Sequence, residues 1–119
     1  MKTQTKSREN NEPYYDIDDD WGLIYASFQS QYGIRLSQAL HGMSWREFSY
    51  LVNGLSGNTP LGQAVAIRAE DDPEMLKDFT PDQRRFRAEY RTKIAKKKSD
   101  KEVDSALDNM KKAFIKMAK

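Results

Sequence analysis

Apolar side chains in this chain recur at steps of three and four residues, the spacing that gathers them on one face of a helix. Trp21, Ile24, Phe28 and Tyr32 follow this spacing. Strands would instead need alternating apolar and polar residues, and no such run is present. We therefore predict an all-α protein, namely a small domain of three to five short helices with an appended amphipathic C-terminal helix.

Capping residues mark the ends of the predicted helices. Asp18–Asp20 offers N-caps before the first stripe, and Gly33 suits a left-handed C-cap. Ser44–Glu47, Thr80–Gln83 and Ser99–Glu102 match the capping box, in which two side chains satisfy unpaired backbone N–H groups. The predicted helices cover about 19–32, 45–55, 60–70 and 81–97, with one further turn near 74–78.

The C-terminal segment carries a narrow apolar seam on an otherwise charged helix. Val103, Leu107, Met110, Phe114 and Met117 step by four and three residues, which is a heptad pattern over two heptads. That length is short for a coiled coil. Two interpretations stay open: the helix folds back on the centre, or it is exposed and binds a partner or a second copy of the chain.

Charge and hydropathy divide the chain into three predicted segments. Residues 1–20 hold three basic and six acidic residues, whereas residues 96–119 hold eight lysines and four acids. The polar start is too poor in apolar side chains to fold by burial. We predict a disordered arm at 1–16, a helical core domain at 17–95 and a Lys-rich amphipathic tail at 96–119.

The residue inventory argues against catalysis and against metal or cofactor binding. The chain has no Cys and one His, His41, and neither a nucleophile elbow nor a phosphate-binding loop is present. Asp16, Asp18, Asp19 and Asp20 lack the EF-hand spacing, so helix capping is the preferred interpretation. No apolar run approaches the roughly 20 residues that span a bilayer. We expect that the chain is not an enzyme, that it binds no cofactor and that it does not associate with a membrane.

A basic stretch raises the alternative of nucleic-acid binding. Arg84 to Lys98 contains eight basic residues and one acid, and basic helices can follow phosphates. The net charge of the whole chain is only +2, which favours a solvated helix face or an acidic partner. The candidate basic patch consists of Arg84, Arg85, Arg87, Arg91 and Lys93.

The order of aromatic, Gly and polar residues over 17–92 resembles one phage family. The residues that carry the resemblance are Ile24-Tyr25-Ala26-Ser27-Phe28, Gln31-Tyr32-Gly33-Ile34, Trp45-Arg46-Glu47-Phe48, Leu51, Gly54-Leu55-Ser56, Asn58-Thr59-Pro60-Leu61 and Ile67-Arg68. The family is that of the small tail-assembly proteins of long-tailed phages of Gram-positive hosts, encoded just before the tape measure. A second aromatic frequent in such proteins is replaced here by Ser44.

The resemblance implies a non-enzymatic tail-assembly chaperone. Its expected partners are the tape-measure protein and tail-tube subunits; it would act in the host cytoplasm and be absent from the virion. Alternatives are a helical nucleic-acid-binding module at Arg84–Lys98 and a structural tail or connector subunit. The candidate partner-binding residues are Tyr25, Phe28, Tyr32, Trp45 and Phe48 from the matched motifs, with Leu107, Met110 and Phe114 from the C-terminal seam.

Overall fold

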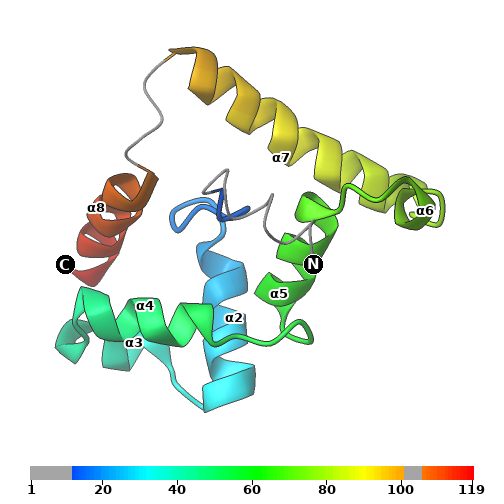
Figure 1. Ribbon diagram of the computed structural model, residues 1–119. Helices are drawn as coiled ribbons and strands as arrows, with labels where there is room; N and C mark the ends of the chain where they lie inside the picture. The colour runs from blue at the N-terminus through cyan, green and yellow to red at the C-terminus, as the bar shows by residue number, and fades with distance from the viewer. Residues whose placement is uncertain (1–11, 101–105) are drawn as a thin grey trace. The chain divides into compact units, whose positions relative to one another are not determined.

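The computed structural model describes residues 12–100 and 106–119, and among these residues it contains helices and no strand. The all-α prediction is therefore confirmed. In chain order, the elements are α2 (Trp21–Tyr32), α3 (Leu36–Ala39), the 3-10 turn η1 (Leu40–Gly42), α4 (Trp45–Asn53), α5 (Pro60–Ala69), α6 (Pro73–Leu76), α7 (Pro81–Asp100) and α8 (Ala106–Ala118) (Figure 1).

Internal contacts divide the chain into two compact units. Of the described residues, the aromatic unit contains Tyr15–Ala64 and Leu107–Lys119, and the α7 unit contains residues 12–14, 65–100 and Ala106. The predicted boundary at 95/96 falls inside α7, and most of α8 belongs to the aromatic unit. Of the predicted arm at 1–16, residues 1–11 lie outside the described residues.

The capping residues behave largely as predicted. The Ser44 hydroxyl accepts a hydrogen bond from the Glu47 N–H at 3.0 Å. In the second box, Thr80 Oγ1 accepts from the Gln83 N–H at 3.1 Å, and Gln83 Oε1 accepts from the Thr80 N–H at 2.9 Å. Gly33 ends α2 with a φ of 70°, in the left-handed region that favours glycine.

Two predictions about helix caps are wrong. Asp20 precedes α2, but its carboxylate makes no capping bond to the helix and instead accepts from the Asp16 N–H at 2.9 Å. Ser99 was expected to begin a new helix, yet it lies within α7. Ala95 and the lysines that follow are good helix formers, so nothing stops α7 at residue 97. Lys101 and Glu102 lie outside the described residues.

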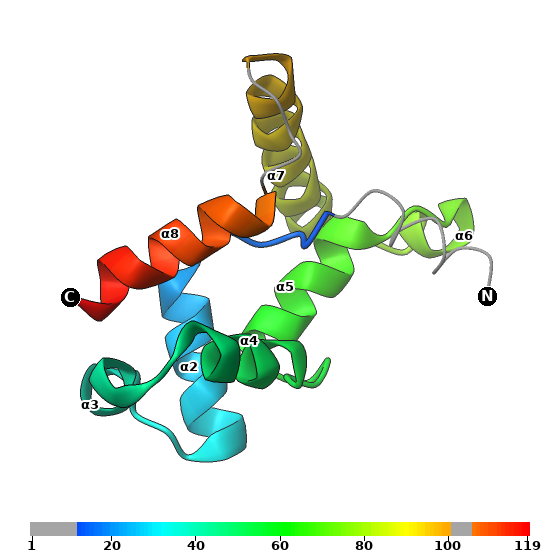
Figure 2. The ribbon, with the colours of Figure 1, turned by 60° about the vertical axis from the view of Figure 1, so that its left-hand side comes forward.

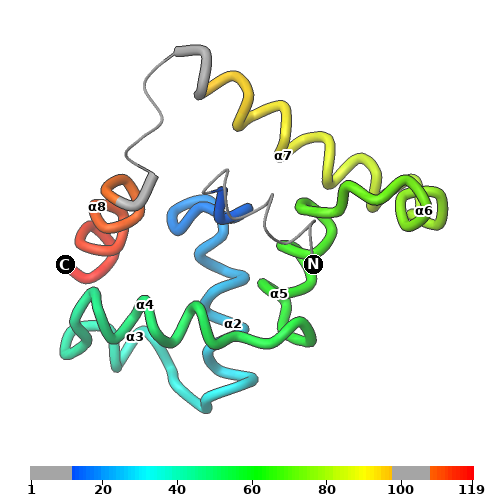
Figure 3. Tube along the Cα trace, viewed as in Figure 1, coloured from blue at the N-terminus to red at the C-terminus, as the bar shows by residue number. Residues whose placement is uncertain are grey.

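Side chains near the end of α2 form hydrogen bonds with α4 and with the turn after it. Figure 3 shows the path of the chain from α2 to α4. The Tyr32 hydroxyl donates to the Leu51 carbonyl at 2.6 Å. Gln31 bonds this turn twice, donating to the Gly54 carbonyl at 2.9 Å and accepting from the Ser56 N–H at 2.8 Å. These bonds satisfy backbone groups left unpaired where α4 ends. The end of the helix predicted over about 45–55 therefore depends on side chains of α2 as well as on the glycines of the turn that follows it.

Ser27 performs the matching function at the beginning of α5. Its fully buried hydroxyl donates to the Leu23 carbonyl at 2.7 Å and accepts from the Leu61 N–H at 2.9 Å. The Leu61 N–H is one of the first donors of α5, which lack partners within the helix. Thr59 adds a second capping bond by accepting from the Gly62 N–H at 3.0 Å.

The core of the aromatic unit is formed by apolar residues of α2, α3, α4, α5 and α8 together with Ile17. Its buried hydrophobic side chains are Ile17, Ile24, Phe28, Leu36, Leu40, Phe48, Val52, Leu61, Ala64 and Phe114. Phe28, Ile24 and Leu36 have no exposed surface. Of the aromatic residues on α2 and α4, Phe28 and Phe48 are buried, and Trp21, Tyr25, Tyr32 and Trp45 are half-buried.

The α7 unit is organised around a buried arginine. Arg68 is 7% exposed, and its guanidinium lies 4.7 Å from the Phe86 ring centre and 4.5 Å from that of Tyr90. It also donates to the Tyr14 carbonyl at 3.1 Å. The Tyr90 hydroxyl donates to Glu12 at 2.6 Å. The apolar stripe of α7 is thus partly covered by a cation, in the geometry of a cation–π interaction.

Gly62 allows two backbone segments to approach closely, and its replacement should destabilise the protein. A Cβ at this position would clash with the Ser56 carbonyl oxygen and lie 2.8 Å from the Gly57 Cα. We expect Gly62→Ala to lower the free energy of unfolding by about 1–3 kcal/mol in urea denaturation. The matched control is Gly22→Ala in α2, where the added Cβ meets nothing within 4 Å. It should be neutral or stabilising by up to about 1 kcal/mol; equal effects of the two substitutions would contradict this account.

Burial of Tyr15 predicts a loss of stability at alkaline pH. Desolvation raises the pKa of its hydroxyl from 10.0 to about 12. The Tyr15 hydroxyl of the unfolded chain loses its proton at a lower pH than that of the folded chain. The contribution of the protonated, buried Tyr15 to the free energy of unfolding is therefore fully present below pH 10 and is lost as the pH rises toward 12. At pH 11 the loss amounts to about 1.4 kcal/mol. Tyr15→Phe cannot ionise, so its urea midpoint should fall less between pH 8 and 11; parallel curves for the two proteins would refute the assignment.

Candidate partner-binding surface

Phe48 of α4 lies where aromatic rings from three helices meet. Its side chain is 1% exposed. The Phe48 ring centre lies 6.3 Å from that of Trp21 and 5.4 Å from that of Phe28, both on α2. It lies 6.1 Å from Trp45 on its own helix and 4.9 Å from Phe114 on α8. All of these separations fall within the range in which aromatic pairs attract each other.

Helix α8 is anchored to α4 through Phe114, which is 4% exposed. The ring centres of Phe114 and Trp45 are 5.5 Å apart, and both ribbon views show α8 beside the beginning of α4 (Figures 1 and 2). We call the Trp45 and Phe48 rings, on which Phe114 packs, the aromatic surface. Two interpretations were open for the C-terminal seam. At Phe114 the helix folds back on the rest of the unit, and the alternative that this side chain is exposed is wrong.

The polar contacts of α8 lie at its exposed edge. Lys116 Nζ is 3.0 Å from Asp18 Oδ2, and these side chains are 68% and 48% exposed. His41 Nδ1 lies 3.2 Å from the Ala118 carbonyl oxygen. An exposed ion pair contributes about 0–1 kcal/mol, whereas burying a Phe side chain contributes about 1.5–3 kcal/mol. The attachment of α8 therefore depends mainly on Phe114.

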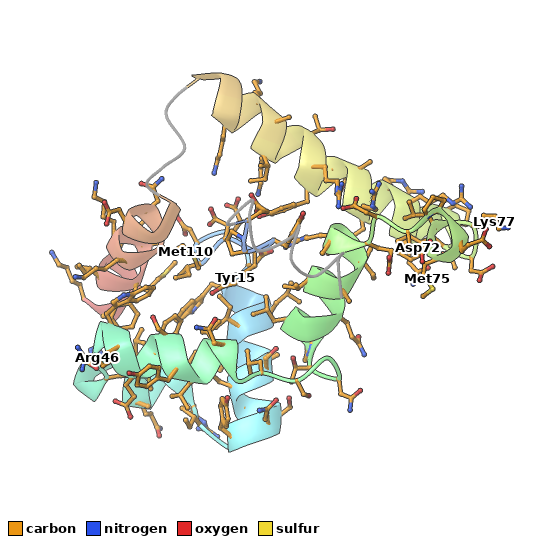
Figure 4. All side chains as sticks on the ribbon, viewed as in Figure 1. Tyr15, Arg46, Asp72, Met75, Lys77 and Met110 are labelled. Atoms are coloured by element: carbon orange, nitrogen blue, oxygen red, sulfur yellow. The ribbon has the colours of Figure 1, made fainter. Side chains whose placement is uncertain are left out.

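The other apolar side chains of α8 are less buried than Phe114. Met110 and Met117 are half-buried, and Figure 4 shows Met110 on the side of the helix nearest to Tyr15. Ile115 is 45% exposed. The side chain of Leu107, the first predicted seam residue in α8, lies outside the described residues.

The remaining predicted partner-binding residues differ in accessibility. Phe28 is fully buried, and Tyr32 is half-buried with its hydroxyl on the Leu51 carbonyl. Tyr25 is also half-buried, and its hydroxyl donates to the Ser37 hydroxyl at 2.9 Å. Trp45 is half-buried. The structure brings Phe28, Trp45, Phe48 and Phe114 into one cluster, whereas Tyr25 has its hydroxyl on α3.

Two of the predicted basic residues hold the end of α5 within the α7 unit. Arg87 Nε donates to the Glu70 carbonyl at 2.9 Å, and Arg91 Nε donates to the Arg68 carbonyl at 2.8 Å. Both guanidinium groups also pair with Asp71, at 3.3 Å and 2.9 Å. The carbonyls at a helix C-terminus have no partner within the helix, and cations there are favourable. Arg87 and Arg91 thus have a structural role.

The other residues of the predicted basic patch also have contacts within the α7 unit. Arg84 donates to the carbonyls of Phe79 at 3.2 Å and Lys77 at 3.1 Å. Arg85 pairs with Asp82 at 2.8 Å, and the Lys93 ammonium lies 5.5 Å from the Tyr90 ring centre. Phosphate binding would have to compete with these contacts.

Arg68 is the residue whose role sequence analysis missed. It shares a helix face with Leu61, Ala64 and Val65, and this position in an apolar stripe is the signal of its burial. The stacking on Phe86 and Tyr90 depends on how α5 and α7 pack, which local spacing does not specify.

The acidic cluster and His41 also have structural contacts. Asp16 Oδ1 accepts from the Asp19 N–H at 2.9 Å, and Asp18 pairs with Lys116. Within the described residues, no group of three or more His, Asp or Glu side chains is placed to hold a metal ion. None of the helices described is long and apolar enough to cross a membrane.

A family model for the bacteriophage Gp15 protein matches residues 1–92, more than three-quarters of the chain. The chain belongs to the bacteriophage Gp15 family. It is therefore a phage protein, and the resemblance seen in its motifs is confirmed at this level. No curated protein and no solved structure matches the chain significantly. The match to the Gp15 family ends within α7, so it includes the aromatic surface of α4 and leaves out α8.

Replacement of Phe48 should test whether the aromatic cluster holds the unit together. Phe48→Ala removes the ring that four other rings contact, and we expect a loss of about 3–5 kcal/mol in the free energy of unfolding. Tyr50→Ala on the same helix is the control, because Tyr50 is 68% exposed and its replacement should change stability by less than about 0.5 kcal/mol. Urea denaturation followed by circular dichroism measures both; similar losses would contradict the cluster's central role.

Proposed function

We propose that this Gp15-family protein is a non-enzymatic tail-assembly chaperone that binds the tape-measure protein while the phage tail is built. Membership of a phage family supports a role in the structure or assembly of the particle. The tail-tube subunit is the second proposed partner. We further propose that the protein acts in the host cytoplasm and is absent from the finished virion.

The observation that favours this role is the docking of an amphipathic helix on the aromatic surface. Trp45 and Phe48 receive the Phe114 ring at 5.5 Å and 4.9 Å. Binding a helix through a few large apolar anchors is a general mode of peptide recognition. A tape-measure protein is long and helical, and its apolar stripes need cover before the tail tube encloses them. A small protein that can cover such a stripe suits that task.

The composition of the chain also suits a protein that must keep an aggregation-prone partner in solution. Charged residues make up 32% of the chain and apolar residues 38%. Among the residues that the structure describes, the large exposed hydrophobic side chains are Tyr50, Met75 and Ile115. Figure 4 labels Met75 on α6. Scattered single side chains of this kind do not form an aggregation-prone patch.

Co-expression with the neighbouring tape-measure protein tests the proposal. The wild-type chain should raise the soluble fraction of the tape measure several-fold and be recovered with it in a pull-down. Tyr50→Ala should act as well as wild type, whereas Phe48→Ala should lose the effect together with its fold. Absence of both solubilisation and co-purification with the wild-type chain would refute the proposed function.

Mass spectrometry of purified virions separates a chaperone from a structural tail or connector subunit. A chaperone should be missing from the particle while abundant in infected cells. Stoichiometric amounts in mature tails would instead assign the chain to the virion structure.

A further inference from the structure

The contact between α8 and α4 has the features of an interaction that a partner can replace. We propose that the aromatic surface of Trp45 and Phe48 is the binding site for an amphipathic helix of the tape-measure protein, and that α8 occupies this site in the free protein. The identity of the partner rests on the proposed function. Binding of the tape measure then requires displacement of α8.

Helix α8 contributes one large side chain to the buried contact. Phe114 is 4% exposed, whereas its neighbour Ile115 is 45% exposed. By contrast, α2 contributes Ile24, Ser27 and Phe28 to the interior. The polar contacts of α8, Lys116 with Asp18 and His41 with the Ala118 carbonyl, are both exposed. A partner helix with a similar anchor can therefore replace every contact described for α8.

The family match covers only one side of the contact between α4 and α8. The match at 1–92 includes Trp45 and Phe48, whereas α8 begins at Ala106. Without α8, the Phe48 face that lies 4.9 Å from Phe114 would lose its cover. An aromatic surface of this kind is unfavourable in water. The matched segment thus forms a surface that must be covered by something outside it.

The contacts of α8 define the chemistry of the replacing helix. It needs an aromatic anchor that takes the place of Phe114, with flexible apolar side chains one turn before and after, as Met110 and Met117 are placed in α8. Methionine suits such contacts because its side chain adapts to irregular surfaces. A basic residue two positions after the anchor would replace Lys116, which is 3.0 Å from Asp18.

A labelled peptide of residues 106–119 provides the first test, because it can bind in trans only where the chain's own α8 has left the site. Full-length Phe114→Ala should bind the peptide about tenfold more tightly than wild type. Ile115→Ala is the matched control on the same helix and should bind like wild type. The same peptide with Ala at the Phe114 position should not bind. Equal affinity of all three proteins for the peptide would overturn the proposal.

A charge exchange tests the same displacement without touching the aromatic cluster. Lys116→Glu places two carboxylates together at Asp18, and it should raise peptide affinity about two- to fivefold. The double variant Asp18→Lys with Lys116→Glu restores the intramolecular ion pair and sets the new lysine against Lys116 of the peptide, so the peptide affinity should fall to the wild-type value or below it. Circular dichroism checks that all variants keep their helices. Failure of the double variant to restore weak binding would contradict competition at this site.

Binding to the tape-measure protein separates this proposal from the proposed function. Phe114→Ala should bind the tape measure more tightly than wild type and Ile115→Ala. If wild type binds the tape measure and Phe114→Ala binds no better, competition by α8 is wrong while the chaperone role stands. If Phe114→Ala binds the peptide but neither protein binds the tape measure, the proposed function fails. A wild-type dimer that dissociates in Phe114→Ala would assign the site to a second copy of the chain and overturn the proposal.

Discussion

The packing of aromatic rings around Phe48 is the interaction on which the aromatic unit depends. Rings from α2, α4 and α8 surround a side chain that is 1% exposed. A chain with few apolar residues has little else to bury, so large rings must supply much of its hydrophobic stabilisation. This explains why aromatic residues mark the matched motifs. It also explains why Phe28 and Phe48 are buried in the core, whereas Trp21 and Trp45 at its edge are half-buried.

Hydrogen bonds from α2 fix the positions of the neighbouring helices. The Ser27 hydroxyl accepts from the Leu61 N–H at the beginning of α5, while Gln31 and Tyr32 donate to carbonyls at the end of α4 and in the turn after it. Each bond satisfies a backbone group that a helix end leaves unpaired. In the α7 unit arginines have the same role, since Arg87 and Arg91 donate hydrogen bonds to backbone carbonyls at the end of α5. Much of the polar motif pattern is therefore explained by the joining of short helices.

Local sequence signals predicted most helices because their causes are local. The Thr80–Gln83 box and the Gly33 cap depend on residues a few positions apart, and both form as predicted. The position of Phe114 could not be predicted, because the heptad seam is equally suited to folding back or to a partner. The role of Arg68 and the intramolecular contacts of the basic patch were missed for a related reason. They depend on the packing of α5 and α7, which lie far apart in sequence.

Amide hydrogen exchange of the chain, alone and bound to the tape-measure protein, tests the central claim most directly. The account predicts that amides of α8 exchange faster in the complex, because the helix has been displaced from the aromatic surface. Amides of α4 should stay protected in the same complex, since the partner replaces the cover. Slower exchange throughout α8 on binding, or no change in either helix, would contradict the account.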